Sequence, residues 1–283
     1  PIPVVDLTCR TPQYDRYLCE ALVADGENVV MWSAGCHSDT LDDAGVPIRH
    51  GWRDAMVDVP VCNSRVQKAL KASEYLLNLL ALTIHVLTQK PPAVHFQWLP
   101  LLDLVAWELT AIRWMQAAGI RVVYTVHDLL PLDGTDGSDV VDRYRRIYRT
   151  ADALICHTEA SKQLLVEEFG IDPANIWLIP HGPLDAQPGE NETAGEHVDA
   201  SSVTGADAAG RWVVLFGVLR PYKGYEFLLR TWPRVAESVP DAHLVIAGRA
   251  SEDVQRDVEA SIDTHGISNS VTTTLRYLSD AEL

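Results

Sequence analysis

The stretch that decides the fold is WVVLFGVLRPYKG, residues 212–224. Its first five residues form an apolar run of strand length, and a helical pattern begins directly after its last glycine. Between strand and helix stand two cations, Arg220 and Lys223, three residues apart. Helix N-termini attract anions, and arginine and lysine neutralise phosphate charge, so the stretch predicts a diphosphate site at the end of a buried strand. The alternative is a pair of solvated cations on a surface loop.

The same alternation of apolar runs and helical patterns extends along the chain and indicates βαβ units with parallel sheets. We expect strands at residues 4–7, 28–32, 93–96, 120–126, 153–156, 176–179, 212–216, 243–247 and 271–274. We expect helices at residues 11–25, 63–88, 101–118, 138–150, 158–169, 225–238 and 251–265. The fold class is therefore predicted to be α/β, with two Rossmann-like domains.

A change of composition separates the two predicted domains. Residues 185–210 contain no Lys or Arg and little apolar content, which is typical of a linker or mobile loop. We therefore expect an N-terminal domain at 1–182, an acidic flexible linker at 183–210 and a partial C-terminal domain at 211–283. A capping box near the end of the sequence announces a further helix, so the second domain is expected to be incomplete here.

Composition and charge exclude several classes of protein. With 283 residues, 47% of them hydrophobic, the chain can bury a large core. A formal net charge of -16 argues against nucleic acid as a partner. The most apolar run, residues 76–87, is shorter than the ~20 residues of a membrane span, and no signal peptide opens the chain. We expect a soluble, cytoplasmic protein.

Several cofactor sites also lack their sequence patterns. No GxxxxGK[ST] or GxGxxG stretch is present, so the usual ATPase and dinucleotide signatures are missing. No DxD triplet occurs, and we expect neither a metal nor another cofactor. The five cysteines form no CxxC, and we interpret them as reduced thiols.

Six motifs occur together in a fixed order, and jointly they resemble the family-4 retaining glycosyltransferases, which have the GT-B fold. They are VHFQW (94–98), YTVHD (124–128), ADALI (151–155), IPHG (179–182), FGVLRPYKG (216–224) and LVIAG (244–248). The similarity covers nearly the whole chain and is strongest from about residue 93. It implies two Rossmann-like domains that face each other across a cleft.

The resemblance also implies the activity and the donor site. The expected reaction moves a sugar from a nucleotide diphosphate sugar to an acceptor, such as a glycan or lipid-linked saccharide, with retention at the anomeric carbon. His127 would face the donor sugar, Arg220 and Lys223 would bind the diphosphate, and the leaving phosphate would take the acceptor proton. The donor side would further include Gly217, Gly248 and Tyr277.

Further residues have two interpretations each. His127 either contacts the sugar or is held by its neighbour Asp128. The acceptor side would be lined by His95, Gln97 and Trp98, or these residues form a packed strand end instead. Gly182 would form a positive-φ hinge turn. The helix at 138–150 is basic and contains Arg143, Arg145, Arg146 and Arg149. It would either contact a phosphorylated acceptor or a membrane surface, or present an ordinary solvated face.

Two departures from the family pattern limit these expectations. The loop of residues 8–12 lacks the paired glycines that many relatives place near the donor phosphate. The Glu-x7-Glu motif that binds the donor sugar and ribose in relatives is absent, so this stretch of chain is expected to be inactive alone. A catalytically inactive GT-B module that binds a sugar nucleotide or a partner protein remains the alternative, and a sugar-nucleotide epimerase is a minor one.

Overall fold

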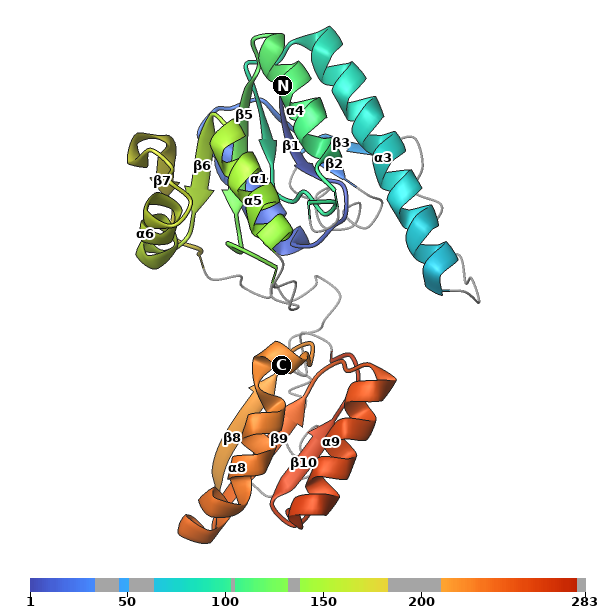
Figure 1. Cartoon of the computed structure of the whole chain (residues 1–283), viewed down its shortest axis with the longest axis vertical. Coiled ribbons are helices and arrows are strands. Elements are labelled where there is room, and N and C mark those ends of the chain that lie inside the picture. Colours follow the sequence, from blue (N-terminus) through green and yellow to red (C-terminus); the bar gives the residue numbers. More distant parts are fainter. Residues whose placement is uncertain (34–45, 51–63, 103–104, 132–137, 183–209, 279–283) are drawn as a thin grey trace. The chain divides into compact units, whose positions relative to one another are not determined.

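The computed structural model describes the chain except for residues 34–45, 51–63, 103–104, 132–137, 183–209 and 279–283. The chain divides into two compact units, Pro1–Leu184 and Asp185–Leu283 (Figure 1). Each unit contains a parallel sheet with helices packed on it. The predicted linker and the predicted capping box fall almost wholly outside the described residues.

Unit 1 is built on a seven-stranded sheet with the order β3-β2-β1-β4-β5-β6-β7. Every neighbouring pair is parallel. The strand order reverses between β1 and β4, and such a switch point opens a crevice at the carboxyl ends of the strands. The strands are β1 (Ile2–Asp6), β2 (Val29–Ser33), β3 (Ile48–His50), β4 (Ala93–Phe96), β5 (Arg121–Val126), β6 (Ala153–Cys156) and β7 (Ile176–Leu178).

Helices cover both faces of this sheet because neighbouring strand residues point to opposite sides. Val5 packs in the large core under α3, α4 and α5, whereas Val4 packs in a smaller cluster with Cys19 of α1. Figure 1 shows α3, α4 and α5 side by side on one face. The helices are α1 (Pro12–Ala24), α3 (Ser64–Gln89), α4 (Trp107–Ala117), α5 (Ser138–Thr150) and α6 (Glu159–Glu167).

Two elements of unit 1 differ from the sequence expectation. Strand β3 was not predicted, because its three residues include an arginine and a histidine and form no apolar run. Helix α4 begins at Trp107, whereas residue 101 was expected. Its buried Glu108 accepts hydrogen bonds from the Leu101 backbone N–H at 3.0 Å and from the Tyr75 hydroxyl at 2.8 Å. The bond to Glu108 holds Leu101 in a turn ahead of the helix.

One described helix, α3, is long and apolar enough over Ala69–Gln89 to cross a membrane by length and composition alone. This stretch is longer than the apolar run at 76–87, because its mean hydropathy stays high across the few polar residues that it contains. Leu82 and Val86 on its inner side are fully buried in the core of unit 1. The helix therefore packs as a core helix of this unit.

Unit 2 has a three-stranded parallel sheet with the order β10-β9-β8. Its core joins Leu229 and Trp232 of α8 to Ile246 of β9 and Val258 of α9. In Figure 1 both helices lie on the same face of the sheet. The described elements follow the predicted ones closely: β8 (Arg211–Phe216), α8 (Tyr225–Ser238), β9 (Ala242–Ala247), α9 (Glu252–His265) and β10 (Val271–Thr274).

Candidate functional site

The carboxyl edge of the unit 1 sheet gathers aromatic and histidine side chains. Parallel strands end at the same edge, so the residues that follow β4, β5, β6 and β7 become neighbours. Tyr14 lies in α1, which follows β1. Its ring centroid is 4.9 Å from that of His127, 5.3 Å from His157 and 5.1 Å from His181. His127 is therefore one member of a three-histidine cluster, which the sequence analysis missed.

Trp98 connects this cluster to the switch point between β1 and β4. Its indole Nε1 donates a hydrogen bond to Thr11 Oγ1 at 3.0 Å, in the loop after β1. The Arg10 guanidinium carbon lies 5.0 Å from the centroid of the Trp98 ring. On the same side chain, His127 stacks with a centroid distance of 4.7 Å and an interplanar angle of 10°. These residues therefore lie at the edge of the sheet where the strand order predicts a crevice.

A hydrogen-bonded chain lies beneath His127. His127 Nε2 is 3.1 Å from Gln97 Oε1, Gln97 Nε2 is 3.3 Å from His95 Nε2, and His95 Nε2 is 2.8 Å from Thr125 Oγ1. Gln97 and His95 are buried, with exposed fractions of 0% and 7%. His95 therefore fits the second of the two interpretations given above, a packed strand end.

The surroundings of His127 keep its imidazole neutral. Burial, together with His157, His181 and His95, lowers the pKa of His127 from 6.5 to about 3. Burial also lowers the pKa of His95 to about 4. Both rings are uncharged at neutral pH, and each has one nitrogen that donates and one that accepts.

The loop after β1 is organised by a buried carboxylate. Asp6 accepts hydrogen bonds from the backbone N–H groups of Thr8 at 3.0 Å, Arg10 at 2.7 Å and Thr11 at 3.4 Å. These N–H groups already have an acceptor inside the protein. The loop that lacks the paired glycines therefore does not present them to a phosphate.

Asp6 also pairs with Asp15 of α1. Both carboxyl groups are fully buried. Burial, the Asp6 charge and a hydrogen bond to Asp6 raise the pKa of Asp15 to about 9. Asp15 is therefore protonated at neutral pH and donates to the Asp6 carboxylate.

The cysteines correct one expectation. Cys9, in the loop after β1 and with a φ of 55°, is disulfide-bonded, so the interpretation as a reduced thiol is wrong for this residue. The spacing of the cysteines along the sequence does not show which of them the fold brings together. Cys19 and Cys156 are free and buried.

In unit 2, two glycines bring the ends of β8 and β9 into direct contact. Gly217 has a φ of 101° and Gly248 a φ of 126°, values that favour glycine. A Cβ on Gly248 would lie 2.2 Å from the Gly217 carbonyl oxygen, and a Cβ on Gly217 would lie 2.8 Å from Lys223 Nζ. Gly248 is thus required by close packing between the two strand ends.

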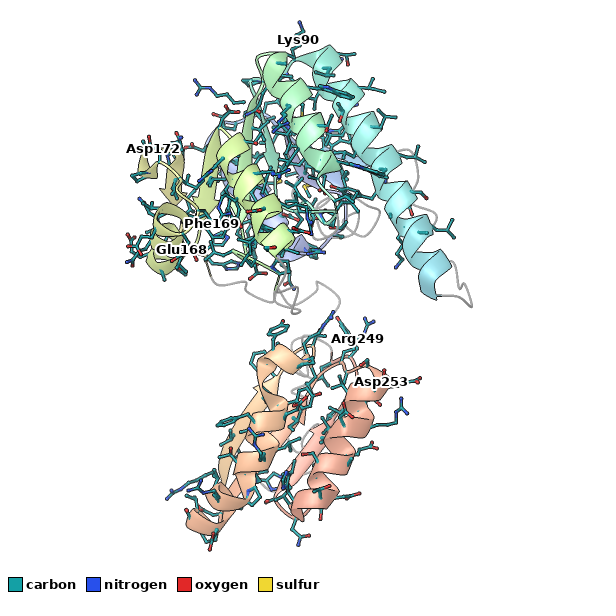
Figure 2. The ribbon with its side chains drawn as sticks, in the orientation of Figure 1. Lys90, Glu168, Phe169, Asp172, Arg249 and Asp253 are labelled. Atoms are coloured by element: carbon teal, nitrogen blue, oxygen red, sulfur yellow. The ribbon has the colours of Figure 1, made fainter. Side chains whose placement is uncertain are left out.

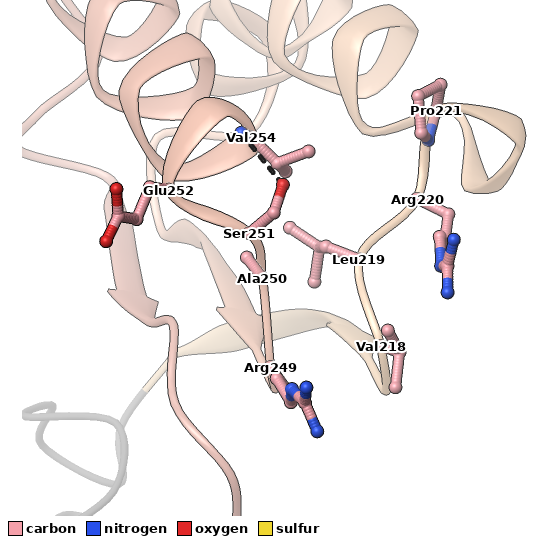
Figure 3. A pocket seen from close by; sticks show the side chains of 9 residues that line it. All are labelled: Val218, Leu219, Arg220, Pro221, Arg249, Ala250, Ser251, Glu252 and Val254. Carbon is pink, nitrogen blue, oxygen red and sulfur yellow. Dashed lines mark hydrogen bonds between the residues drawn. The ribbon is translucent and has the colours of Figure 1, made fainter. Parts of the chain in front are cut away.

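A pocket of about 600 Å³ opens beside these strand ends. Arg220 follows β8, Arg249 follows β9, and Ser251 at the N-terminus of α9 accepts a hydrogen bond from the Val254 N–H (Figure 3). Glu252 in the first turn of α9 also lines the pocket. Figure 2 shows Arg249 at the same end of the unit as Asp253. The sequence analysis missed Arg249, although its place directly after a strand was visible.

Lys223 and Tyr277 lie near the same edge of the sheet, and neither lines this pocket. Lys223 Nζ donates to the Phe216 carbonyl oxygen at 3.5 Å. Tyr277 is 73% exposed in the loop after β10. Gln255 of α9 donates to the carbonyl oxygens of Ala250 at 3.1 Å and Leu275 at 3.2 Å, which ties the loops after β9 and β10 together.

The basic residues of α5 have structural partners in three of four cases. Arg143 Nε donates to the Leu102 carbonyl oxygen at 2.6 Å, and Arg149 Nε donates to that of Phe169 at 3.2 Å. Arg145 pairs with Asp142 at 2.6 Å. Of these four arginines, only Arg146 is exposed without a partner within the described residues.

The predicted hinge turn is corrected at one position. Gly182, expected to adopt a positive φ, is not among the glycines of the described chain that do so. The chain leaves β7 without a left-handed turn there.

Comparison with known proteins identifies the family. A sequence model described as Glycosyltransferase Family 4 matches residues 13–183, which is more than half of the chain. The chain belongs to glycosyltransferase family 4. Among curated proteins, none matches this glycosyltransferase significantly.

Solved structures similar to this family-4 glycosyltransferase share its fold across 99% of the chain. A glycosyltransferase from Rickettsia africae ESF-5 has a TM-score of 0.65 and 14% identity over 68% of its own length. Anabaena Alr3699/HepE in complex with UDP-glucose gives 0.61 and 16% over 69%. UDP-GlcNAc 2-epimerase from Neisseria meningitidis bound to UDP-GlcNAc gives 0.59 and 12% over 73%. These structures show that the family-4 chain has the GT-B type of α/β fold.

Proposed function

We propose that this family-4 glycosyltransferase moves a sugar from a nucleotide diphosphate sugar to an acceptor with retention at the anomeric carbon. The observation that carries the proposal is the pocket of unit 2, where Arg220 and Arg249 stand at two neighbouring strand ends beside a helix N-terminus. A nucleotide diphosphate is the ligand whose charge suits this arrangement. The similarity to HepE, which was solved with UDP-glucose, supports the same donor class.

The cations and His127 have different roles in this proposal. Arg220, Arg249 and Lys223 face the negative charge that grows on the departing diphosphate. His127 stays neutral, because its pKa is about 3, and forms hydrogen bonds with the sugar. A neutral ring with so low a pKa is a weak base, so the acceptor proton is assigned to the leaving phosphate.

We also propose that the reaction needs no metal or other cofactor. In the described part of the chain, no group of three His, Cys, Asp or Glu side chains is placed to hold a metal ion. Arginine and lysine side chains supply the positive charge instead. Turnover that persists in excess chelator supports this, and turnover that stops and returns with a divalent cation contradicts it.

The acceptor proposed here is a glycan or lipid-linked saccharide, and the enzyme is placed in the cytoplasm. Contact of Arg146 with a membrane surface is the alternative to an ordinary solvated helix face. The Trp98 side of the crevice is the acceptor-side candidate in unit 1, since its ring stacks beside His127.

The test incubates the protein with a panel of uridine and guanosine diphosphate sugars and saccharide acceptors. We expect nucleotide release coupled to a new glycoside, whose anomeric configuration, read by NMR, equals that of the donor. An inverted product would contradict the retaining mechanism. An isomerised nucleotide sugar without transfer would identify an epimerase, and binding without turnover would identify the inactive module.

A further inference from the structure

The orientation of the Gln97 amide determines where the His127 ring carries its proton, because its oxygen lies toward His127 and its nitrogen toward His95. The Gln97 Oε1 atom, 3.1 Å from His127 Nε2, can only accept, so His127 Nε2 donates. Gln97 Nε2, 3.3 Å from His95 Nε2, can only donate, so that His95 nitrogen accepts. The Thr125 hydroxyl, 2.8 Å from the same His95 nitrogen, then donates as well. His95 Nε2 has one lone pair, so the two donors share it in a three-centre hydrogen bond in which Thr125 is the nearer donor.

This assignment leaves His127 Nδ1 with a lone pair. Within the described residues, the bond to Gln97 is the hydrogen bond that the His127 ring makes. The ring is half-buried at the edge of the sheet and cannot turn freely, because Trp98 stacks on it and Tyr14 contacts it edge-on. The titratable groups that face it are Tyr14, His95, His157 and His181, and burial raises the pKa of Tyr14 to about 12. None of them supplies a negative charge at neutral pH that would protonate the ring.

We propose that Gln97 is a positioning residue that holds His127 as its Nε2–H tautomer, so that Nδ1 accepts a hydrogen bond from a hydroxyl group of the bound sugar. Both ends of the Gln97 amide are used in the chain, so Gln97 acts through His127 and not as an acceptor contact. The choice of a sugar as the ligand rests on the proposed function, whereas the tautomer of His127 is independent of it.

The first test reads the tautomer directly by NMR of the ¹⁵N-histidine-labelled protein at pH 7. His127 is assigned by the signal that disappears in His127→Asn. We expect a protonated Nε2 in the wild type, a mixture of tautomers in Gln97→Leu, and Nε2–H again in Gln97→Glu, whose carboxylate also raises the pKa of His127. His157 serves as the internal control, because its Nδ1–H donates to the Ile179 carbonyl at 2.9 Å independently of Gln97.

Two results overturn the inference. One is an Nδ1–H tautomer of His127 in the wild type, which decides the matter even if Gln97→Leu does not fold. The other is an unchanged tautomer in a Gln97→Leu protein whose His157 signals match those of the wild type.

The second test uses transfer kinetics with a donor that the wild type turns over. Gln97→Leu should lower kcat/KM about tenfold, which is the size expected for the loss of one hydrogen bond, and should cause no further loss in His127→Ala. Additive losses would overturn the positioning role. If His127 has the Nε2–H tautomer but no sugar is transferred from any donor, the proposed function and the sugar ligand fail, and the tautomer stands.

Discussion

At the scale of single residues, the proposed donor site predicts that the cations of unit 2 govern donor affinity and rate. Arg220→Ala and Lys223→Ala should each lower turnover about a hundredfold, since one electrostatic stabiliser of a transition state contributes on the order of 3 kcal/mol. Arg249→Ala should weaken donor binding by about tenfold, because it lines the same pocket as Arg220.

Arg256→Ala is the matched control for these variants. This arginine is exposed on α9, where it pairs with Asp253 and lies outside the pocket. Steady-state kinetics and calorimetry on the four variants give the comparison. If Arg220→Ala and Lys223→Ala behave like Arg256→Ala, the donor site has been placed wrongly.

A second prediction concerns the buried pair of Asp15 and Asp6. The pKa of Asp15 is about 9 in the folded protein and about 4 in an unfolded chain. Its contribution to stability is therefore complete below about pH 4 and is lost as the pH rises towards 9. In Asp15→Asn, the new side-chain amide would donate to Asp6 at any pH without first having to bind a proton. This variant should therefore raise the melting temperature, and more at pH 8 than at pH 5.

The exposed Asp257 provides the control, since Asp257→Asn should change the melting temperature little at either pH. Thermal unfolding followed by circular dichroism measures both variants. An Asp15→Asn protein that is less stable than the wild type at pH 8 would show that Asp15 is ionised in the fold.

Sequence reasoning found the residues at strand ends and missed the relations between strands. Arg220 and Lys223 lie between an apolar run and a helical pattern, so their place followed from local pattern, whereas the role of His127 came from the resemblance to the family. Arg249 belongs to no motif and becomes relevant only because β9 pairs with β8. The bond between His95 and Thr125 likewise depends on the pairing of β4 with β5, which no local pattern specifies.

At the scale of elements, the contact between the ends of β8 and β9 is the most constrained feature of unit 2. Gly248→Ala should destabilise this unit by at least about 2 kcal/mol, because a positive φ strains any other residue and the new Cβ would overlap the Gly217 carbonyl. Gly266→Ala is the control, since it shares a positive φ of 63° but has no atom within 4 Å of the new Cβ.

Denaturant unfolding compares the two glycine variants. The account expects a clearly larger loss for Gly248→Ala than for Gly266→Ala. Equal losses would mean that backbone conformation alone, and not packing between strand ends, makes glycine necessary at position 248.

The basic helix α5 gives a further prediction at this scale. Three of its arginines bind the carbonyl oxygens of Leu102 and Phe169 or the carboxylate of Asp142, so within the described part of this helix Arg146 is the arginine left for a membrane surface. In a protein with a net charge of -16, one arginine without a partner within the described residues gives little attraction. We expect sedimentation with vesicles to be indifferent to their anionic lipid content. Binding that grows with anionic lipid and is lost in Arg146→Glu would establish the membrane contact.

Elements were predictable where patterns were strong. Periodicity located α5 and α8, whose bounds match the expectation at 138–150 and 225–238. It failed for β3, which is short and polar, and for the start of α4, where the buried Glu108 fastens the preceding backbone through a side-chain hydrogen bond. Such a bond connects residues seven apart and leaves no periodic signal.

At the scale of the whole molecule, we propose that unit 1 contacts the sugar and that unit 2 binds the diphosphate. The cluster around His127 and the pocket beside Arg220 each lie within one unit. The predicted cleft, in which the two sites would face each other, follows from the resemblance to the family. Binding of the diphosphate should therefore depend on unit 2 residues and be unaffected by His127→Ala.

Calorimetric titration of uridine and guanosine diphosphates into the protein shows whether unit 2 holds the donor site. We expect saturable binding of at least one of them at a single site. Arg220→Ala and Lys223→Ala should each weaken this binding by about tenfold or more, and His127→Ala should leave it unchanged. Failure of the wild type to bind either nucleotide, or equal affinity in the wild type and Arg220→Ala, would contradict the assignment of the donor site.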